Sequence, residues 1–223
     1  MQQSILNEAA GALRTLIDAV MAVPIDRTTV VAGSLNQAAG SLRAGAETAI
    51  DGLSFGGALA DLFRLLRQAG ASFAAVDAVR VQGLQTATRS GVAGVVVDTV
   101  VLQALACQCR IVADMTFSSR GQVDSVRAAL DAGFESSLTK ASNDFDQVTV
   151  RALVSLRAAV MRDLTVRARP LPKMISYTFP QRRPALAIAQ RLYADGDRYL
   201  EVIQENAAVH PLFMPASGRA LSR

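Results

Sequence analysis

The chain has 223 residues, of which 51% are hydrophobic and 19% charged, and it contains no tryptophan. This length supports one or two domains with a real core, and the composition excludes a mainly disordered chain. Residues 1–150 carry 11 basic and 14 acidic side chains, which gives −3, whereas residues 151–223 carry 12 and 5, which gives +7. The basic C-terminal third is therefore expected to face an acidic protein surface or a nucleic acid.

Residues 1–164 are predicted to form an α-helical region, because apolar residues recur there at helical spacing. The first helix carries Leu6, Leu13 and Ile17 on one face and ends before Pro24. Further helical patterns begin near residues 26, 59, 71, 118 and 143, and the longest of them extends from 71 to 115. Many positions hold Ala or Gly, so these helices are expected to cover a neighbour better than they build a thick core of their own.

The longest apolar run, residues 91–109, has about the length of a membrane span. It carries Asp98, however, and a carboxylate in mid-span costs a few kcal/mol. The run is therefore interpreted as a helix buried in protein, and no membrane span is expected. Cys107 and Cys109 point about 200° apart on a helix, which predicts two buried free thiols and no disulfide.

The segment "VRARPLPKMISYTFPQRR", residues 166–183, has three prolines and no acidic residue. Its prolines predict a tether over residues 165–173, and the alternating apolar residues after it predict a strand over 174–179. Five basic residues are candidates for docking a partner: Arg167, Arg169, Lys173, Arg182 and Arg183. They are either a solvated basic tether or a docking strip for an acidic surface.

Residues 174–223 are predicted to form a small module with the order strand, helix, helix, strand. Pro184 suits the first turn of one helix, Asp195-Gly196 is a turn pair, and Asp197 can cap a second helix. The expected core of the module consists of Leu192, Tyr193, Ile203, Phe213 and Leu221. The fold class is thus mainly α: a long-helix region followed by a small α+β module.

No catalytic constellation is visible in the sequence. His210 is the only histidine and is expected to make a structural hydrogen bond. One histidine and two cysteines are too few for a zinc site, and no glycine-rich phosphate-binding pattern occurs. We therefore expect a binding protein without a catalytic site, metal or cofactor, and not an enzyme.

The closing segment "IAQRLYADGDRYLEVIQENAAVHPLFMPASGRAL", residues 188–221, resembles the C-terminal end of the DNA circularisation (DNA circulation) proteins of Mu-like bacteriophages. The order of elements, with Ala187-Ile188-Ala189 and Asn206, resembles a LysM fold. The residues that match the phage pattern are Arg191-Leu192-Tyr193, Asp195, Asn206, His210-Pro211, Phe213, Pro215, Gly218 and Leu221. The usual Gly-Asp-Thr loop of LysM domains is replaced by "SYTFPQRRPAL", which weakens a glycan-binding interpretation.

The resemblance implies a structural component of a contractile phage tail, in the baseplate near the hub and tube. Such a protein acts by protein–protein docking with other tail and baseplate proteins, in multiple copies within a symmetric assembly. Its expected location is the virion, assembled in the cytoplasm of the host bacterium. Two alternatives stay open: a DNA-binding protein that acts on phage genome ends, and a peptidoglycan-binding LysM protein.

Overall fold

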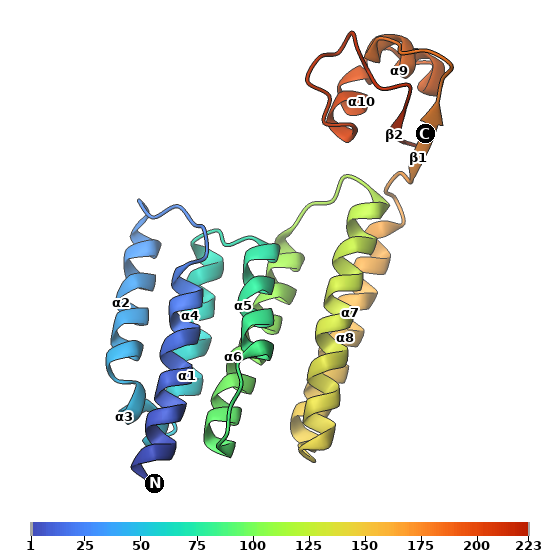
Figure 1. The fold of residues 1–223 in the computed structure, drawn as a ribbon. Coiled ribbons are helices and arrows are strands. Elements are labelled where there is room, and N and C mark those ends of the chain that lie inside the picture. Colours follow the sequence, from blue (N-terminus) through green and yellow to red (C-terminus); the bar gives the residue numbers. More distant parts are fainter. Residues whose placement is uncertain (1, 223) are drawn as a thin grey trace. The chain divides into compact units, whose positions relative to one another are not determined.

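The computed structural model describes residues 2–222 and is mainly helical (Figure 1). The helices α1–α8 are Gln3–Met21, Val30–Ala44, Ala46–Asp51, Phe55–Gln68, Phe73–Gln85, Gly91–Asp114, Arg120–Asn143 and Gln147–Ala168. They are followed by β1 (Met174–Thr178), α9 (Ala185–Tyr193), α10 (Tyr199–Glu205) and β2 (Ser217–Leu221). This confirms the predicted fold class. The chain divides into two compact units, residues 1–115 with 130–157 and residues 116–129 with 158–223.

The helices α1–α6 share one continuous core. Helix α1 packs on α2, α3, α5 and α6, and α4 packs on α2 and α6. The largest side chain in this core is Phe63 of α4, which is 1% exposed and is surrounded by buried leucines, isoleucines and valines. The prediction that these helices lack a thick core of their own is therefore wrong for α1–α6. Leu and Phe on α1 and α4 supply the bulk that the small residues of the other helices do not.

The apolar pattern over residues 71–115 forms two helices, because serine side chains start each of them. The hydroxyl of Ser72 accepts a hydrogen bond from Ala75 N at 3.2 Å, and that of Ser90 accepts one from Ala93 N at 3.3 Å. Gly83 lets the two helices approach closely, since a Cβ at this position would lie 2.7 Å from a methyl carbon of Val101. The break between α5 and α6 thus lies after Gly83 and before the second serine cap.

Helix α6 is long and apolar enough to cross a membrane, with a mean hydropathy of 1.8 over 18 residues. In the protein, however, 56% of that window is buried. Its polar side chains have protein partners: Asp98 forms an ion pair with Lys140 at 3.0 Å, and Gln108 donates to Asp77 at 3.0 Å. A core helix of a folded domain has these features, so we keep the interpretation of α6 as a helix buried in protein.

Cys107 and Cys109 on α6 are free and buried, as predicted. Burial raises the pKa of the Cys107 thiol to about 11 and that of the Cys109 thiol to about 12. Because the thiolate is the reactive form, we expect iodoacetamide at pH 8 to modify both cysteines at least about 100-fold more slowly in the native protein than in urea. Mass spectrometry of timed samples measures this ratio. Equal rates in the two states would contradict the burial of these thiols.

Helices α7 and α8 form an antiparallel hairpin whose turn lies at residues 144–146. Arg157 of α8 joins the two helices through ion pairs with Asp131 at 3.1 Å and Glu135 at 2.8 Å of α7. Helix α8 continues to Ala168, so the first four residues of the predicted tether 165–173 are helical. The helix continues because residues 165–168 contain neither Gly nor Pro, and the chain leaves it only just before Pro170.

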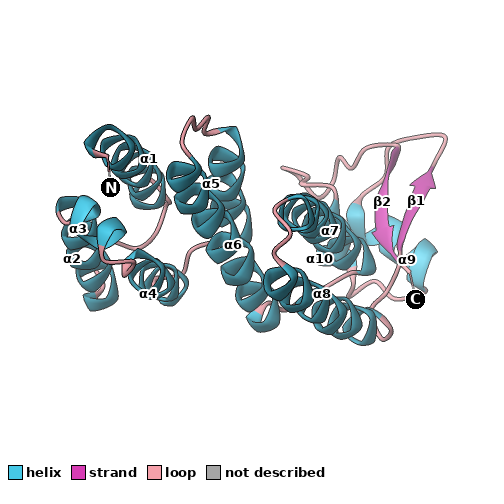
Figure 2. Cartoon of the chain, turned by 90° about the horizontal axis from the view of Figure 1, so that it is seen from below, coloured by secondary structure: helices cyan, strands magenta, loops and turns pink. Residues whose placement is uncertain are grey.

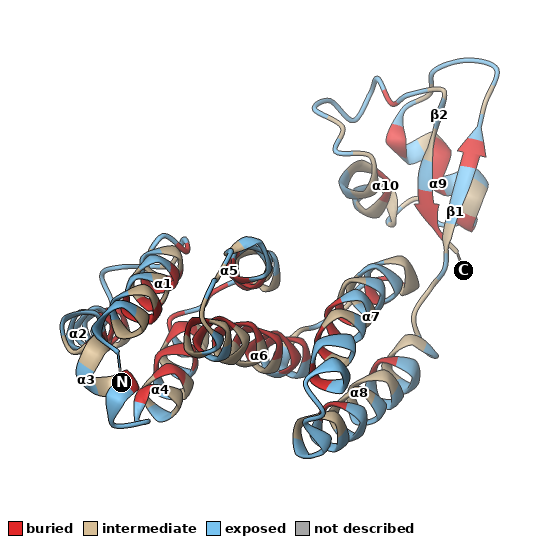
Figure 3. Ribbon diagram, turned by 60° about the horizontal axis from the view of Figure 1, so that its bottom comes forward, coloured by how far each residue is buried: buried red, intermediate tan, exposed pale blue. Residues whose placement is uncertain are grey.

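The C-terminal module is built on an antiparallel pair of strands, with register from Met174↔Leu221 to Thr178↔Ser217. Helix α10 packs against α9 and beside β2 (Figures 2 and 3). The cluster of buried residues consists of Tyr177, Ala185, Ile188, Ala189, Tyr193, Val202, Met214 and Ala220. The module thus has the predicted order of strand, helix, helix and strand.

The predicted core of the module needs one correction. Tyr193 and Leu221 are buried, and Leu192 and Ile203 are half-buried against the cluster. Phe213, in contrast, is 67% exposed, and the neighbouring Met214 is fully buried in its place. Residues 211–213 form a turn, in which Phe213 N donates to His210 O at 3.1 Å, and this turn directs Phe213 to the surface and Met214 inward.

Candidate protein-docking site

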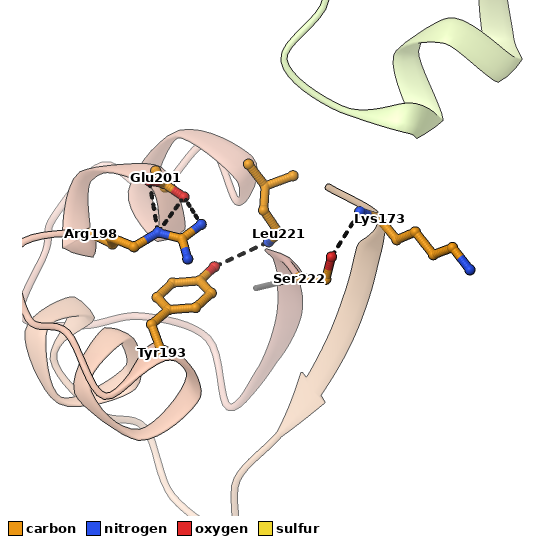
Figure 4. A network of polar contacts seen from close by, with 6 residues as sticks. All are labelled: Lys173, Tyr193, Arg198, Glu201, Leu221 and Ser222. Atoms are coloured by element: carbon orange, nitrogen blue, oxygen red, sulfur yellow. Dashed lines mark hydrogen bonds and ion pairs between the residues drawn. The ribbon is translucent and has the colours of Figure 1, made fainter. Parts of the chain in front are cut away.

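Three residues of the phage-like pattern close the outer edge of β2. The side-chain amide of Asn206 donates to Arg219 O at 2.7 Å and accepts from Arg219 N at 2.8 Å. The hydroxyl of Tyr193 accepts from Leu221 N at 3.1 Å (Figure 4). Gly218 lies directly between Asn206 and the Tyr177 ring, where no side chain fits. These residues therefore hold the module together and leave its surface to other side chains.

The five residues of the predicted docking strip do not form one continuous surface along the chain. Arg167 is part of α8, where it forms an ion pair with Asp163 at 3.1 Å and lies 4.8 Å from the centre of the Phe117 ring. Its guanidinium group is thus engaged within the protein, and its role in partner docking stays a prediction. Strand β1 then separates Arg169 and Lys173, which precede it, from Arg182 and Arg183, which follow it.

Arg169 and Lys173 line two open clefts, of about 550 and 420 Å³, together with Arg120. Arg127 and Asp124 also line the larger cleft, and Asp124 is the one carboxylate among the described residues that line the two. The side chains of Arg169, Lys173 and Arg127 form no ion pair or hydrogen bond with residues 2–222. We call Arg120, Arg127, Arg169 and Lys173 the basic cleft.

Arg120 fixes the backbone of this cleft. Its guanidinium donates to Leu171 O at 2.9 Å and to Arg169 O at 2.7 Å, and its backbone N–H donates to Pro172 O at 3.0 Å. Charge-assisted hydrogen bonds of this kind are among the stronger ones in proteins. The tether is thus clasped to the start of α7, and the positions from which Arg169 and Lys173 project are set before any partner binds.

At the other end of β1, two arginines lie over Phe179. The guanidinium carbons of Arg183 and Arg191 are 5.6 and 5.8 Å from the centre of this ring, within the range of cation–π interactions. Arg182 is exposed beside them. This second basic group therefore combines positive charge with an aromatic surface.

Arg120, Arg127 and Arg191 were not among the predicted docking residues. Arg120 and Arg127 lie on α7, 49 and 42 residues before Arg169, so sequence spacing gives no sign of their proximity. The only signal for a basic surface was the excess of basic residues after residue 150, and Arg120 and Arg127 lie before that point in the sequence.

His210 makes the expected kind of structural contact. Its Nδ1 accepts from Leu212 N at 3.2 Å, and its ring lies 5.3 Å from that of Phe213.

Within residues 2–222, no group of three or more His, Cys, Asp or Glu side chains could hold a metal ion. A scan against protein-family models and a search of curated proteins both found no match for this chain.

Proposed function

We propose that this chain is a structural component of a contractile bacteriophage tail, located in the baseplate near the hub and tube. It acts by docking other tail proteins, in multiple copies, and performs no chemistry. The basic cleft is the observation that carries the docking role, since the side chains of Arg127, Arg169 and Lys173 have no ion-pair or hydrogen-bond partner among the described residues and Arg120 holds the backbone of the tether in place. The phage location rests on the resemblance of residues 188–221 to DNA circularisation proteins.

A protein partner accounts for the cleft better than DNA does. Its four cations come from α7, the end of α8 and the tether, so they do not lie along one helix that could enter the major groove. No aromatic ring lines the cleft within the described residues, whereas proteins that bind single strands stack bases on such rings.

Removal of two charges from the cleft tests the proposal. We expect Arg169→Gln with Lys173→Gln to reduce the yield of assembled tails at least about tenfold, because the cleft would lose two of the charges that pair with the partner. The assay is complementation of a phage that lacks the gene, with tails counted by electron microscopy. The control is Arg151→Gln with Arg162→Gln, which removes the same charge from exposed positions of α8.

Binding assays on the same variant distinguish the alternatives. Normal tails together with a loss of DNA affinity and of its steep salt dependence would contradict the docking proposal and favour action on genome ends. Normal tails together with a loss of peptidoglycan pull-down would favour a LysM-type glycan binder. The module should keep its melting temperature in each variant, since neither charged side chain contacts its core.

A further inference from the structure

The two edges of the sheet in the C-terminal module differ. Hydrogen bonds from Ser222 N to Lys173 O and from Phe179 N to Ala216 O show which residues of the ladder face each other. In an antiparallel pair, every second residue bonds to the neighbouring strand and those between point away. The backbone groups of Met174, Ser176 and Thr178 therefore point outward from β1.

This outer edge of β1 is open. The backbone N–H and C=O groups of Met174, Ser176 and Thr178 have no hydrogen-bond partner among residues 2–222. On β2, the N–H and C=O groups of Arg219 are bound by the side chain of Asn206, and the N–H of Leu221 is bound by the hydroxyl of Tyr193. Ser176 and Thr178 are exposed, and α10 packs beside β2 (Figure 2). One edge is thus closed by side chains while the other offers a row of free donors and acceptors.

We propose that the open edge of β1 binds an extended, acidic segment of a partner protein, which adds a third strand to the sheet. This inference rests on the docking function proposed above and specifies its partner. Main-chain hydrogen bonds provide the pairing, as in other cases of strand addition. One face of the added strand would meet Ile175, which is 38% exposed, and Phe179, so that alternate residues of the segment should be apolar.

The charges at both ends of β1 select the partner. Lys173 lies at one end and Arg182 and Arg183 follow the other, while no carboxylate occurs between Asp163 and Asp195. A second copy of β1 would place these cations against one another in either direction, and such repulsion disfavours self-pairing. The carboxylates of an acidic segment would instead lie beside the cations at both ends of β1. Since Met174 and Lys173 both line the larger cleft, one of these ends would enter the basic cleft.

Amide hydrogen exchange of the free protein tests the open edge. We expect the amides of Ser176 and Thr178 to exchange about 100-fold faster than those of Tyr177 and Arg219, which are bonded. The probe for binding is a synthetic eight-residue peptide of alternating Thr and Val with two Glu at each end, and a Lys-ended peptide is the control. Only the acidic peptide should bind, and it should protect the amides of Ser176 and Thr178.

Two variants connect this binding with the edge. Ser176→Pro removes an outward N–H at an edge position that tolerates proline, and we expect at least about a tenfold loss of peptide affinity. Ser176→Val keeps the N–H and should bind normally. The inference is overturned if the peptide does not bind, if it binds without protecting these amides, or if Ser176→Pro binds as well as wild type. Protection that appears with protein concentration alone would also overturn it, because a second copy would then occupy the edge.

The same variants separate this inference from the proposed function. Normal tail assembly with Ser176→Pro, together with defective assembly when Arg169 and Lys173 are replaced, would overturn strand addition and retain docking. If a particle containing this protein cannot be found at all, the proposed function fails, whatever the peptide does.

Discussion

Gly218→Ala is expected to destabilise the C-terminal module while the helices α1–α8 keep their stability. A Cβ at this position would lie 2.6 Å from the Tyr177 hydroxyl and would collide with the side-chain oxygen of Asn206. Neither neighbour can move freely, because Asn206 is hydrogen-bonded to Arg219 and Tyr177 is 5% exposed. We expect a loss of about 2–4 kcal/mol, from overpacking and from broken hydrogen bonds to β2.

Tyrosine fluorescence reports on the module alone, because Tyr177, Tyr193 and Tyr199 are the only tyrosines and the chain has no tryptophan. The melting temperature that it records should fall by at least about 10 °C. Circular dichroism at 222 nm follows mainly α1–α8 and should change little. Gly196→Ala is the matched control, since its Cβ would have only ordinary contacts, the nearest at 3.6 Å. Equal melting of the two variants would show that the Gly218 contacts are misassigned.

Arg120→Met is expected to release the tether from the start of α7. The change keeps much of the side-chain length but removes the hydrogen bonds to Leu171 O and Arg169 O. Each bond from a charged donor contributes about 1.5–3 kcal/mol. In wild type the Arg120 amide, which donates to Pro172 O, should be protected from exchange, and the backbone amide at the same position of the variant should exchange at least about tenfold faster.

The control for this variant is Arg127→Met, which removes an exposed charge from the same cleft but no hydrogen bond. Its amide at residue 120 should stay protected. If the amide at residue 120 exchanged at the wild-type rate in Arg120→Met, the side-chain hydrogen bonds of Arg120 would not be what holds the tether. The backbone of the basic cleft would then not be fixed by Arg120.

Local rules predicted most of the elements of this fold. Apolar spacing located α1 and α4, and turn residues located the two strands and two helices of the module, because these signals act over a few residues. The end of α8 was placed four residues too early because residues 165–168 were assigned to the proline-containing tether, although Pro170 and Pro172 lie beyond them.

The site was harder to predict than the fold. Arg169 and Lys173 were identified from charge, but Arg120 meets Arg169 across 49 residues, and no periodicity gives such a pairing. The i,i+4 pairing of Arg167 with Asp163 was missed because the helix was ended at residue 164, and Phe117 lies 50 residues before Arg167 in the sequence. The exchange of Phe213 and Met214 has a similar origin, since the turn at residues 211–213 is held by a tertiary bond from Ala185 N to Pro211 O.

The hydrogen bonds between Lys173 and Ser222 bring the two ends of the module together (Figure 4). A folded unit whose first and last residues are adjacent can be inserted into a surface loop of another protein without distortion of its host. The same geometry concentrates mechanical load: tension along the tether would act at the Lys173 end of the sheet and would open the β1–β2 ladder one hydrogen bond at a time. Under such tension the module would unfold at low force unless a bound partner carried part of the load.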